Sequence, residues 1–117
     1  MFKTSLLALA ILGAPAFADT PVVENVNVTK SGDLWRFDVT ISHTDKGWDD
    51  YADAWRILDG DGKELGLRDL AHPHTDEQPF TRSLSGVVIP ASVTEVTIQP
   101  RDTINGWASD GKKIKLR

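Results

Sequence analysis

Apolar and polar residues alternate with a period of two along most of the chain after residue 18. The clearest example is residues 34–43, LWRFDVTISH, where Trp35, Phe37, Val39 and Ile41 fall on one face of an extended strand. No window sustains an apolar stripe at helical spacing for three turns. Seven segments follow the strand pattern: residues 23–29, 34–43, 54–58, 63–70, 80–89, 93–100 and 112–117.

Turn-forming residues separate these short segments at nearly regular spacing. The sequence DGDG at residues 59–62 supplies residues that tolerate a positive φ in a tight hairpin. Several short strands without a helix predict an all-β fold, which we expect to be a seven-stranded antiparallel β-sandwich. About 100 residues make one domain of this kind, over residues 19–117.

The first 18 residues, MFKTSLLALAILGAPAFA, have a different pattern. They contain one positive charge at Lys3, an apolar run over residues 6–12 and an A-x-A sequence at residues 16–18. These are the parts of a secretory signal peptide, so residues 1–18 are predicted to be removed on export. The apolar run is too short to span a bilayer, and no cysteine follows it for a lipid anchor. We expect the mature domain to be periplasmic or secreted.

Composition limits the possible partners and the source of stability. The chain contains no cysteine, so the domain is expected to be held together by packing alone, without disulfides. Lys3 is the one charged residue before residue 19, which leaves the mature domain with a net charge of −5. No segment is rich in lysine or arginine. Nucleic acid and anionic membranes are therefore not expected as partners.

Two stretches carry a resemblance to a known class of domains. Trp55 lies in the third predicted strand within DAWRILDGDG, and INGW occupies the loop before the last strand. In this pattern the mature chain resembles immunoglobulin-like and fibronectin type III-like domains of exported bacterial proteins. The resemblance implies an immunoglobulin-like sandwich. It identifies no family of known activity and transfers no functional residue.

Antiparallel strands reverse direction at each connection, so alternate loops lie at the same end of a sandwich. Residues 43–53, 71–79 and 103–110 are predicted to share one end, and the hairpin at residues 59–62 lies at the other. The shared end gathers the three histidines and several aromatic residues, namely His43, His72, His74, Trp48, Tyr51 and Trp107.

The inward-facing positions of five strands change from apolar to ionisable at this same end. These positions are His43, Asp53, Asp69, Arg82 and Asp102. Buried charges need partners, so we expect Arg82 to pair with one of the three aspartates and close the core as a polar plug. His43 could also donate to one of these carboxylates. Alternatively, the same end opens as a ligand or metal pocket.

The sequence His72-Pro73-His74 has the composition of a metal site. In a β conformation the two imidazoles would point the same way, and His43 could supply a third nitrogen for Zn or Cu. Asp76 or Glu77 would then be an oxygen ligand or support a histidine. In polyproline II geometry the two rings would instead diverge, leaving a solvated loop. No other cofactor is expected.

Enzyme function is not expected. No nucleophile elbow, phosphate loop or metalloprotease motif is present, and Ser42 and His43 are neighbours in a strand that point to opposite faces. We predict an exported, non-catalytic binding module for an unidentified protein or small ligand. Its contact surface would be the loop end that carries His43, Trp48, His72, His74 and Trp107, with Tyr51 beside them. The alternative function is transition-metal binding through the three histidines.

Overall fold

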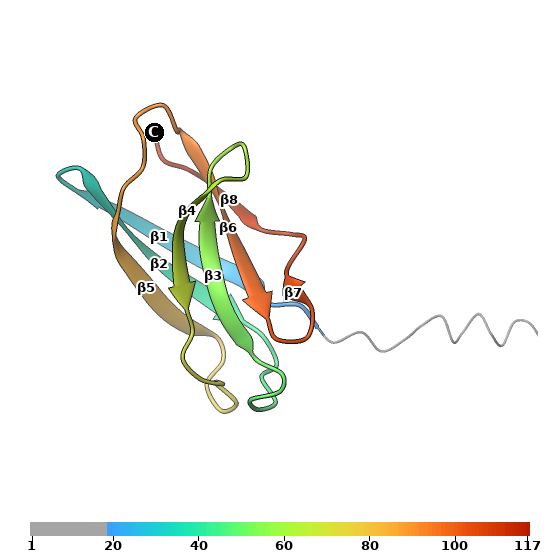
Figure 1. Cartoon of the computed structure of the whole chain (residues 1–117). Helices are drawn as coiled ribbons and strands as arrows, with labels where there is room; N and C mark the ends of the chain where they lie inside the picture. The colour runs from blue at the N-terminus through green and yellow to red at the C-terminus, as the bar shows by residue number, and fades with distance from the viewer. Residues whose placement is uncertain (1–18) are drawn as a thin grey trace, which may run out of the picture.

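The computed structural model describes residues 19–117, in which eight strands form two antiparallel sheets with one core between them (Figure 1). The predicted signal peptide, residues 1–18, lies outside the described residues. The strands are β1 (Val22–Ser31), β2 (Leu34–Ser42), β3 (Ala52–Leu58), β4 (Glu64–Asp69), β5 (Phe80–Val87), β6 (Glu95–Asp102), β7 (Gly106–Trp107) and β8 (Lys112–Lys115).

The all-β class and the two antiparallel sheets expected from the sequence are confirmed, with eight strands instead of seven. The additional strand, β7, is two residues long and lies inside the segment predicted as a loop. Residues 19–117 contain no helix with the length and hydrophobicity needed to cross a membrane.

The chain passes from one sheet to the other three times. One sheet has the order β1-β2-β5, and the other has the order β4-β3-β6-β7, with β8 also paired to β6. The connections β2–β3, β4–β5 and β5–β6 therefore cross between sheets. In Figure 1 the β2–β3 and β4–β5 connections lie together at one end of the sandwich, next to the turn between β6 and β7.

The core follows the alternation of the sequence. Residues Phe37, Val39 and Ile41 of β2 face inward and are at most 1% exposed, while the residues between them are exposed or half-buried. Trp55 of β3 is the largest fully buried side chain in the described chain. It packs between the sheets together with Ile57 and the inward residues of β2. Because the faces of β2 alternate from Trp35 to Ile41, the next inward position along the chain is residue 43.

The edge of the larger sheet next to β6 is formed by two short strands, β7 and β8, instead of one continuous strand. Strand β7 pairs with the end of β6 and β8 pairs with its beginning, so both lie along the same neighbour. Residues 108–111 join them, and Gly111 approaches the backbone of β6 closely. A Cβ atom at Gly111 would lie 2.6 Å from the carbonyl oxygen of Ile98, so only glycine fits there without a shift of the chain.

Candidate functional site

A buried histidine–aspartate pair lies where β2 ends. The inward register of Val39 and Ile41 continues to His43, whose side chain is fully buried. Its Nδ1 atom lies 2.6 Å from Oδ1 of Asp45, another fully buried side chain. Asp45 also accepts hydrogen bonds from the backbone amides of Ala52 and His74 at 3.0 and 2.7 Å. One carboxylate thus joins the start of β3 and the β4–β5 loop to the end of β2.

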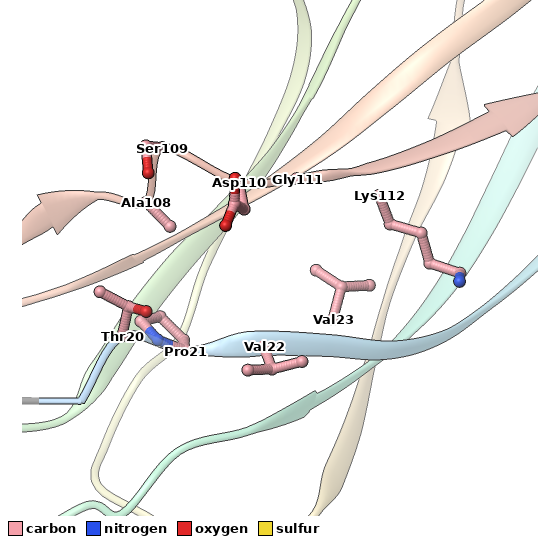
Figure 2. Close-up of a pocket in the computed structure, with 9 residues that line it drawn as sticks. All are labelled: Thr20, Pro21, Val22, Val23, Ala108, Ser109, Asp110, Gly111 and Lys112. Carbon is pink, nitrogen blue, oxygen red and sulfur yellow. The ribbon is translucent and has the colours of Figure 1, made fainter.

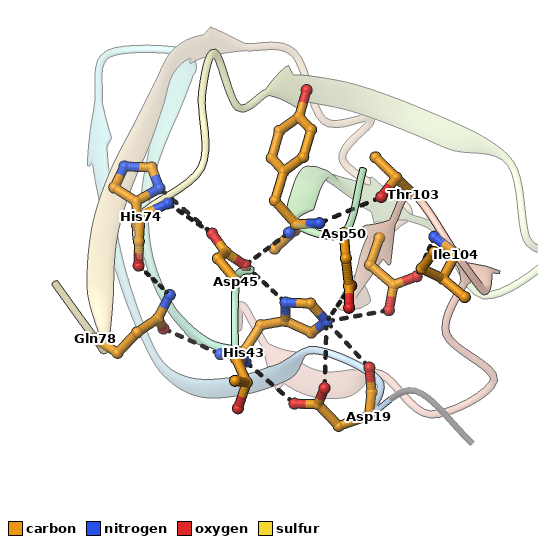
Figure 3. A network of polar contacts seen from close by, with 12 residues as sticks. Asp19, His43, Asp45, Asp50, His74, Gln78, Thr103 and Ile104 are labelled. Carbon is orange, nitrogen blue, oxygen red and sulfur yellow. Dashed lines mark hydrogen bonds and ion pairs between the residues drawn. The ribbon is translucent and has the colours of Figure 1, made fainter. Parts of the chain in front are cut away.

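The other ring nitrogen of His43 faces oxygens from the segment before β1, the end of β6 and the β2–β3 loop, as Figure 3 shows. Nε2 lies 3.0 Å from the carbonyl oxygen of Asp19 and 3.3 Å from Oδ2 of Asp102. Carboxylate oxygens of Asp19 and Asp50 lie 3.7 and 3.8 Å from the same nitrogen. Every group that faces the two ring nitrogens presents an oxygen, so this arrangement favours an imidazole with a proton on both nitrogens.

The electrostatics agree with this geometry. Burial alone would lower the pKa of His43. The hydrogen bond to Asp45 and the negative charges of Asp19, Asp45 and Asp102 outweigh burial and raise the pKa above the ordinary value of 6.5. No lysine or arginine among residues 19–117 forms an ion pair with these carboxylates or with Asp50. The cluster around His43 is otherwise acidic, so it favours the protonated form of this buried ring.

His74 is also buried, but its surroundings favour the neutral form of its ring. Its ring stacks on Phe80 at a centroid distance of 3.8 Å, and Arg82 donates to its Nε2 atom at 2.8 Å. Since Arg82 can only donate, the proton of a neutral His74 must be on Nδ1. Burial, together with the charges of Arg82 and His72, lowers the pKa of His74 below 6.5. His43 and His74 thus favour opposite charge states while both contact Asp45.

The rings of His72 and His74 lie side by side, with 4.5 Å between their centroids, but the described residues do not bring the three predicted histidine ligands together in one group. Both ring nitrogens of His43 and Nε2 of His74 are engaged by protein groups. His72 is exposed, and its Nδ1 atom lies 2.9 Å from the carbonyl oxygen of Pro73. Asp76 and Glu77 are also exposed. Within residues 19–117 no group of three histidine, cysteine, aspartate or glutamate residues could hold a metal ion.

The polar plug exists in a different form from the one predicted. Asp102 is buried, but it faces His43 and accepts from the backbone amides of Ile104 and Asn105. Arg82 does not pair with a carboxylate, because its guanidinium bonds to His74 and to the carbonyl oxygen of Thr81. The other two predicted partners also lie elsewhere: Asp53 pairs with Arg101, and Asp69 is exposed.

The loops around this cluster present aromatic and apolar side chains to solvent. Trp48, in the β2–β3 loop, is 67% exposed and lies edge-on to Tyr51 at a centroid distance of 5.6 Å. Thr103, at the β6–β7 turn, accepts from the amide of Tyr51 and donates to the carbonyl of Asp49. The next residue, Ile104, is 55% exposed. We call Trp48, Tyr51 and Ile104 the loop-end surface.

Trp107 does not belong to that surface. It is half-buried in β7, with the guanidinium carbons of Arg56 and Arg101 at 3.9 and 4.8 Å from its ring centroid. Arg56 belongs to β3 and Arg101 to β6, so the three side chains stack across neighbouring strands of the larger sheet. The contacts are cation–π interactions that stabilise this face of the sheet.

A groove lies between the beginning of β1 and the segment that joins β7 to β8 (Figure 2). One wall contains Pro21 and Val23, and the other contains Ser109 and Asp110. No histidine and no tryptophan lines it. The groove is the gap between two free sheet edges and is separate from the loop-end surface.

Sequence reasoning missed several residues of the buried cluster. No site role was predicted for Asp45, although it is two residues after His43 and its side chain is also fully buried. Asp19, which is half-exposed, and the exposed Ile104 beside the cluster were not singled out either, because their positions depend on how the segment before β1 and the β6–β7 turn fold back.

Comparisons with known proteins found limited similarity. No family model matches the chain, and no solved structure matches it. A protein of Halomicrobium mukohataei named "Putative lipoprotein" is 36% identical to the chain over 93 residues, which are 80% of this chain and 45% of that protein. The chain spans less than half the length of this relative.

Proposed function

We propose that the chain is an exported, non-catalytic binding module that contacts its partner through the loop-end surface. The observation that carries this proposal is the exposure of Trp48, an aromatic side chain at the tip of a loop whose base is fixed by a buried network. Aromatic anchors on ordered loops contribute much of the binding energy at protein interfaces. Ile104 adds a second exposed apolar side chain on the turn that Thr103 ties to the same loop.

Export is supported by two independent features. Residues 1–18 have the charge, the apolar run and the A-x-A sequence of a signal peptide. The similar protein of Halomicrobium mukohataei is named as a lipoprotein, and lipoproteins are exported. On this proposal residues 19–117 form the mature domain, in the periplasm or outside the cell.

An immunoglobulin-like type of sandwich is supported by the strand order and the core. The sheet β1-β2-β5 faces the sheet β4-β3-β6, and three connections cross between them, as in Greek-key sandwiches. Trp55 on the third strand is fully buried at the centre of the core, the place of the core tryptophan in immunoglobulin domains.

A binding role fits the chemistry better than catalysis does. His43 and Asp45 resemble part of a proton-transfer pair, but both ring nitrogens of His43 are bonded inside the protein. A histidine in this state has no free nitrogen with which to take a proton from a substrate. The partner is a protein or a small ligand. The net charge of the mature domain disfavours nucleic acid and anionic membranes.

Site-specific photo-crosslinking tests the proposed surface. A photoreactive amino acid is placed at Trp48 and, as a matched control, at Val88, which is 68% exposed at a position outside the loop-end surface. Both proteins are expressed and exported in the organism of origin and then irradiated. The proposal predicts a discrete adduct from position 48 that is absent from position 88 and is lost when Ile104→Asp is added. Equal labelling from both positions, or none from position 48, would contradict it.

A further inference from the structure

The acidic cluster around His43 joins three segments that are distant in the sequence. Asp19 belongs to the N-terminal segment, Asp45 and Asp50 to the β2–β3 loop, and Asp102 to the end of β6. Each of these segments presents an oxygen to one imidazole ring that has no access to solvent. The ring is therefore the common contact of the segments that surround the loop-end surface.

The hydrogen-bond geometry favours the positively charged form of this ring. A neutral imidazole has one N–H and one lone pair, so one nitrogen of a neutral His43 would point its lone pair at an acceptor oxygen. The contact at Nδ1 is 2.6 Å, whereas those at Nε2 are 3.0 and 3.3 Å. Nδ1 makes the shorter bond, so Nε2 is the site from which a proton leaves first.

We propose that His43 is a protonation latch, which holds the N-terminal segment and the β6–β7 turn against the β2–β3 loop while its ring carries both protons. Loss of the Nε2 proton replaces attraction to Asp19 and Asp102 by lone-pair repulsion. It also leaves the four carboxylates without their buried cation. Asp50 is affected directly, since its buried Oδ1 atom has no hydrogen-bond partner among the described residues.

The latch regulates the loop-end surface through two connections. Asp102 accepts from the amides of Ile104 and Asn105, so release of Asp102 loosens the turn that carries Ile104. Asp50 lies between Trp48 and Tyr51 in the sequence, so repulsion between its carboxylate and the neutral His43 ring acts on the loop that carries both aromatic residues. As regulation of binding, this inference rests on the proposed function. The latch itself is a property of the free protein.

The test is an NMR titration of the free domain, residues 19–117, without any partner. Ring ¹⁵N shifts report the protonation of each nitrogen of His43, and the Cδ1 methyl group of Ile104 reports the β6–β7 turn. The Cδ1 methyl group of the fully buried Ile57 serves as the internal reference. We expect both ring nitrogens to be protonated at about pH 6.5, where half of a free histidine is neutral. The Ile104 methyl group should titrate together with His43, and that of Ile57 should not move.

Charge-neutralising variants test whether the surrounding carboxylates raise the proton affinity of His43. Asp102→Asn keeps an acceptor oxygen but removes the negative charge 3.3 Å from Nε2, and should weaken the proton affinity of His43 about tenfold. Asp50→Asn, which breaks no hydrogen bond of Oδ1, should act in the same direction and serves if Asp102→Asn does not fold. Asp76→Asn, an exposed change in the β4–β5 loop, should alter the proton affinity of His43 less than about twofold.

Three results would overturn the latch. One is a His43 ring with a single proton at about pH 6.5. Another is an Ile104 signal that does not follow the titration of His43. The third is an equal effect of the Asp102 and Asp76 variants. None of them bears on whether Trp48 contacts a partner, which the crosslinking experiment decides separately.

Discussion

Replacing Asp45 by alanine should be among the most damaging single changes in this domain. The side chain is fully buried and accepts three hydrogen bonds, from the ring of His43 and from the amides of Ala52 and His74. Asp45→Ala leaves both amides without a partner inside the protein, at about 1–3 kcal/mol each. It also strands the His43 cation, although deprotonation of the ring limits that cost. We expect a total loss of about 4–6 kcal/mol, much of the stability of a typical domain.

The loss should depend on pH in a defined direction. The folded-state pKa of His43 is raised, so the stabilisation from its protonated form is fully present below 6.5 and declines as pH rises through the folded pKa. Asp45→Ala removes the hydrogen bond to Asp45, which is the largest of the contacts that raise this pKa. Its deficit relative to the wild type should therefore be larger at about pH 6 than at about pH 9.

Urea denaturation of the domain at the two pH values measures both effects, with Asp49→Ala as the control from the same loop. Asp49 is exposed, and its loss should cost under about 0.5 kcal/mol. Asp45→Asn keeps one acceptor oxygen, so its loss of unfolding free energy should fall between those of Asp45→Ala and Asp49→Ala. If Asp45→Ala lies within about 1 kcal/mol of the wild type, the buried network does not hold the loop end as argued.

Three further changes test other parts of the account. Arg82→Leu should raise the pKa of His74, because it removes a positive charge next to the ring, and should reduce the loss of stability as pH falls below 6.5. NMR titration measures the pKa and acid denaturation measures the stability. An unchanged pKa would contradict the contact between Arg82 and His74. Gly111→Ala should cost about 1–3 kcal/mol in urea melts, because its Cβ would meet the carbonyl oxygen of Ile98; a neutral result would show that the chain shifts easily. Trp107→Ala should lower the free energy of unfolding by about 1–2 kcal/mol, because it removes two cation–π contacts. Crosslinking from position 48 should stay intact. Loss of crosslinking in a folded variant would show that Trp107 belongs to the binding surface.

The strand pattern predicted most of the fold because its cause is local. Alternation places Phe37 and Trp55 in the core wherever the sheets meet, and turn residues mark where strands end. Strand β7 was missed because two residues are too short to show a period. The path of residues 108–111, which lets β7 and β8 share one neighbour, depends on the close approach of Gly111 to the backbone of β6 at Ile98.

The candidate site could be predicted only in part. The inward direction of His43 follows from the register of β2, and its burial agrees with that reasoning. The partner of Arg82 could not be derived, since it depends on the path of the β4–β5 loop, which stacks His74 on Phe80. The exposure of Trp48, in contrast to the packing of Trp107, is likewise set by tertiary contacts and not by residue type.

Hydroxyl-radical footprinting tests most directly whether the loop-end surface is the contact surface. The oxidation rate of Trp48 is compared between the purified domain and the protein in its native export compartment, with the exposed Val88 as the reference position. The account predicts that Trp48 and Ile104 are protected in the compartment while Val88 reacts equally in both samples. Equal oxidation of Trp48 in both samples, or protection of Val88 instead, would contradict the assignment of the binding surface to this end of the sandwich.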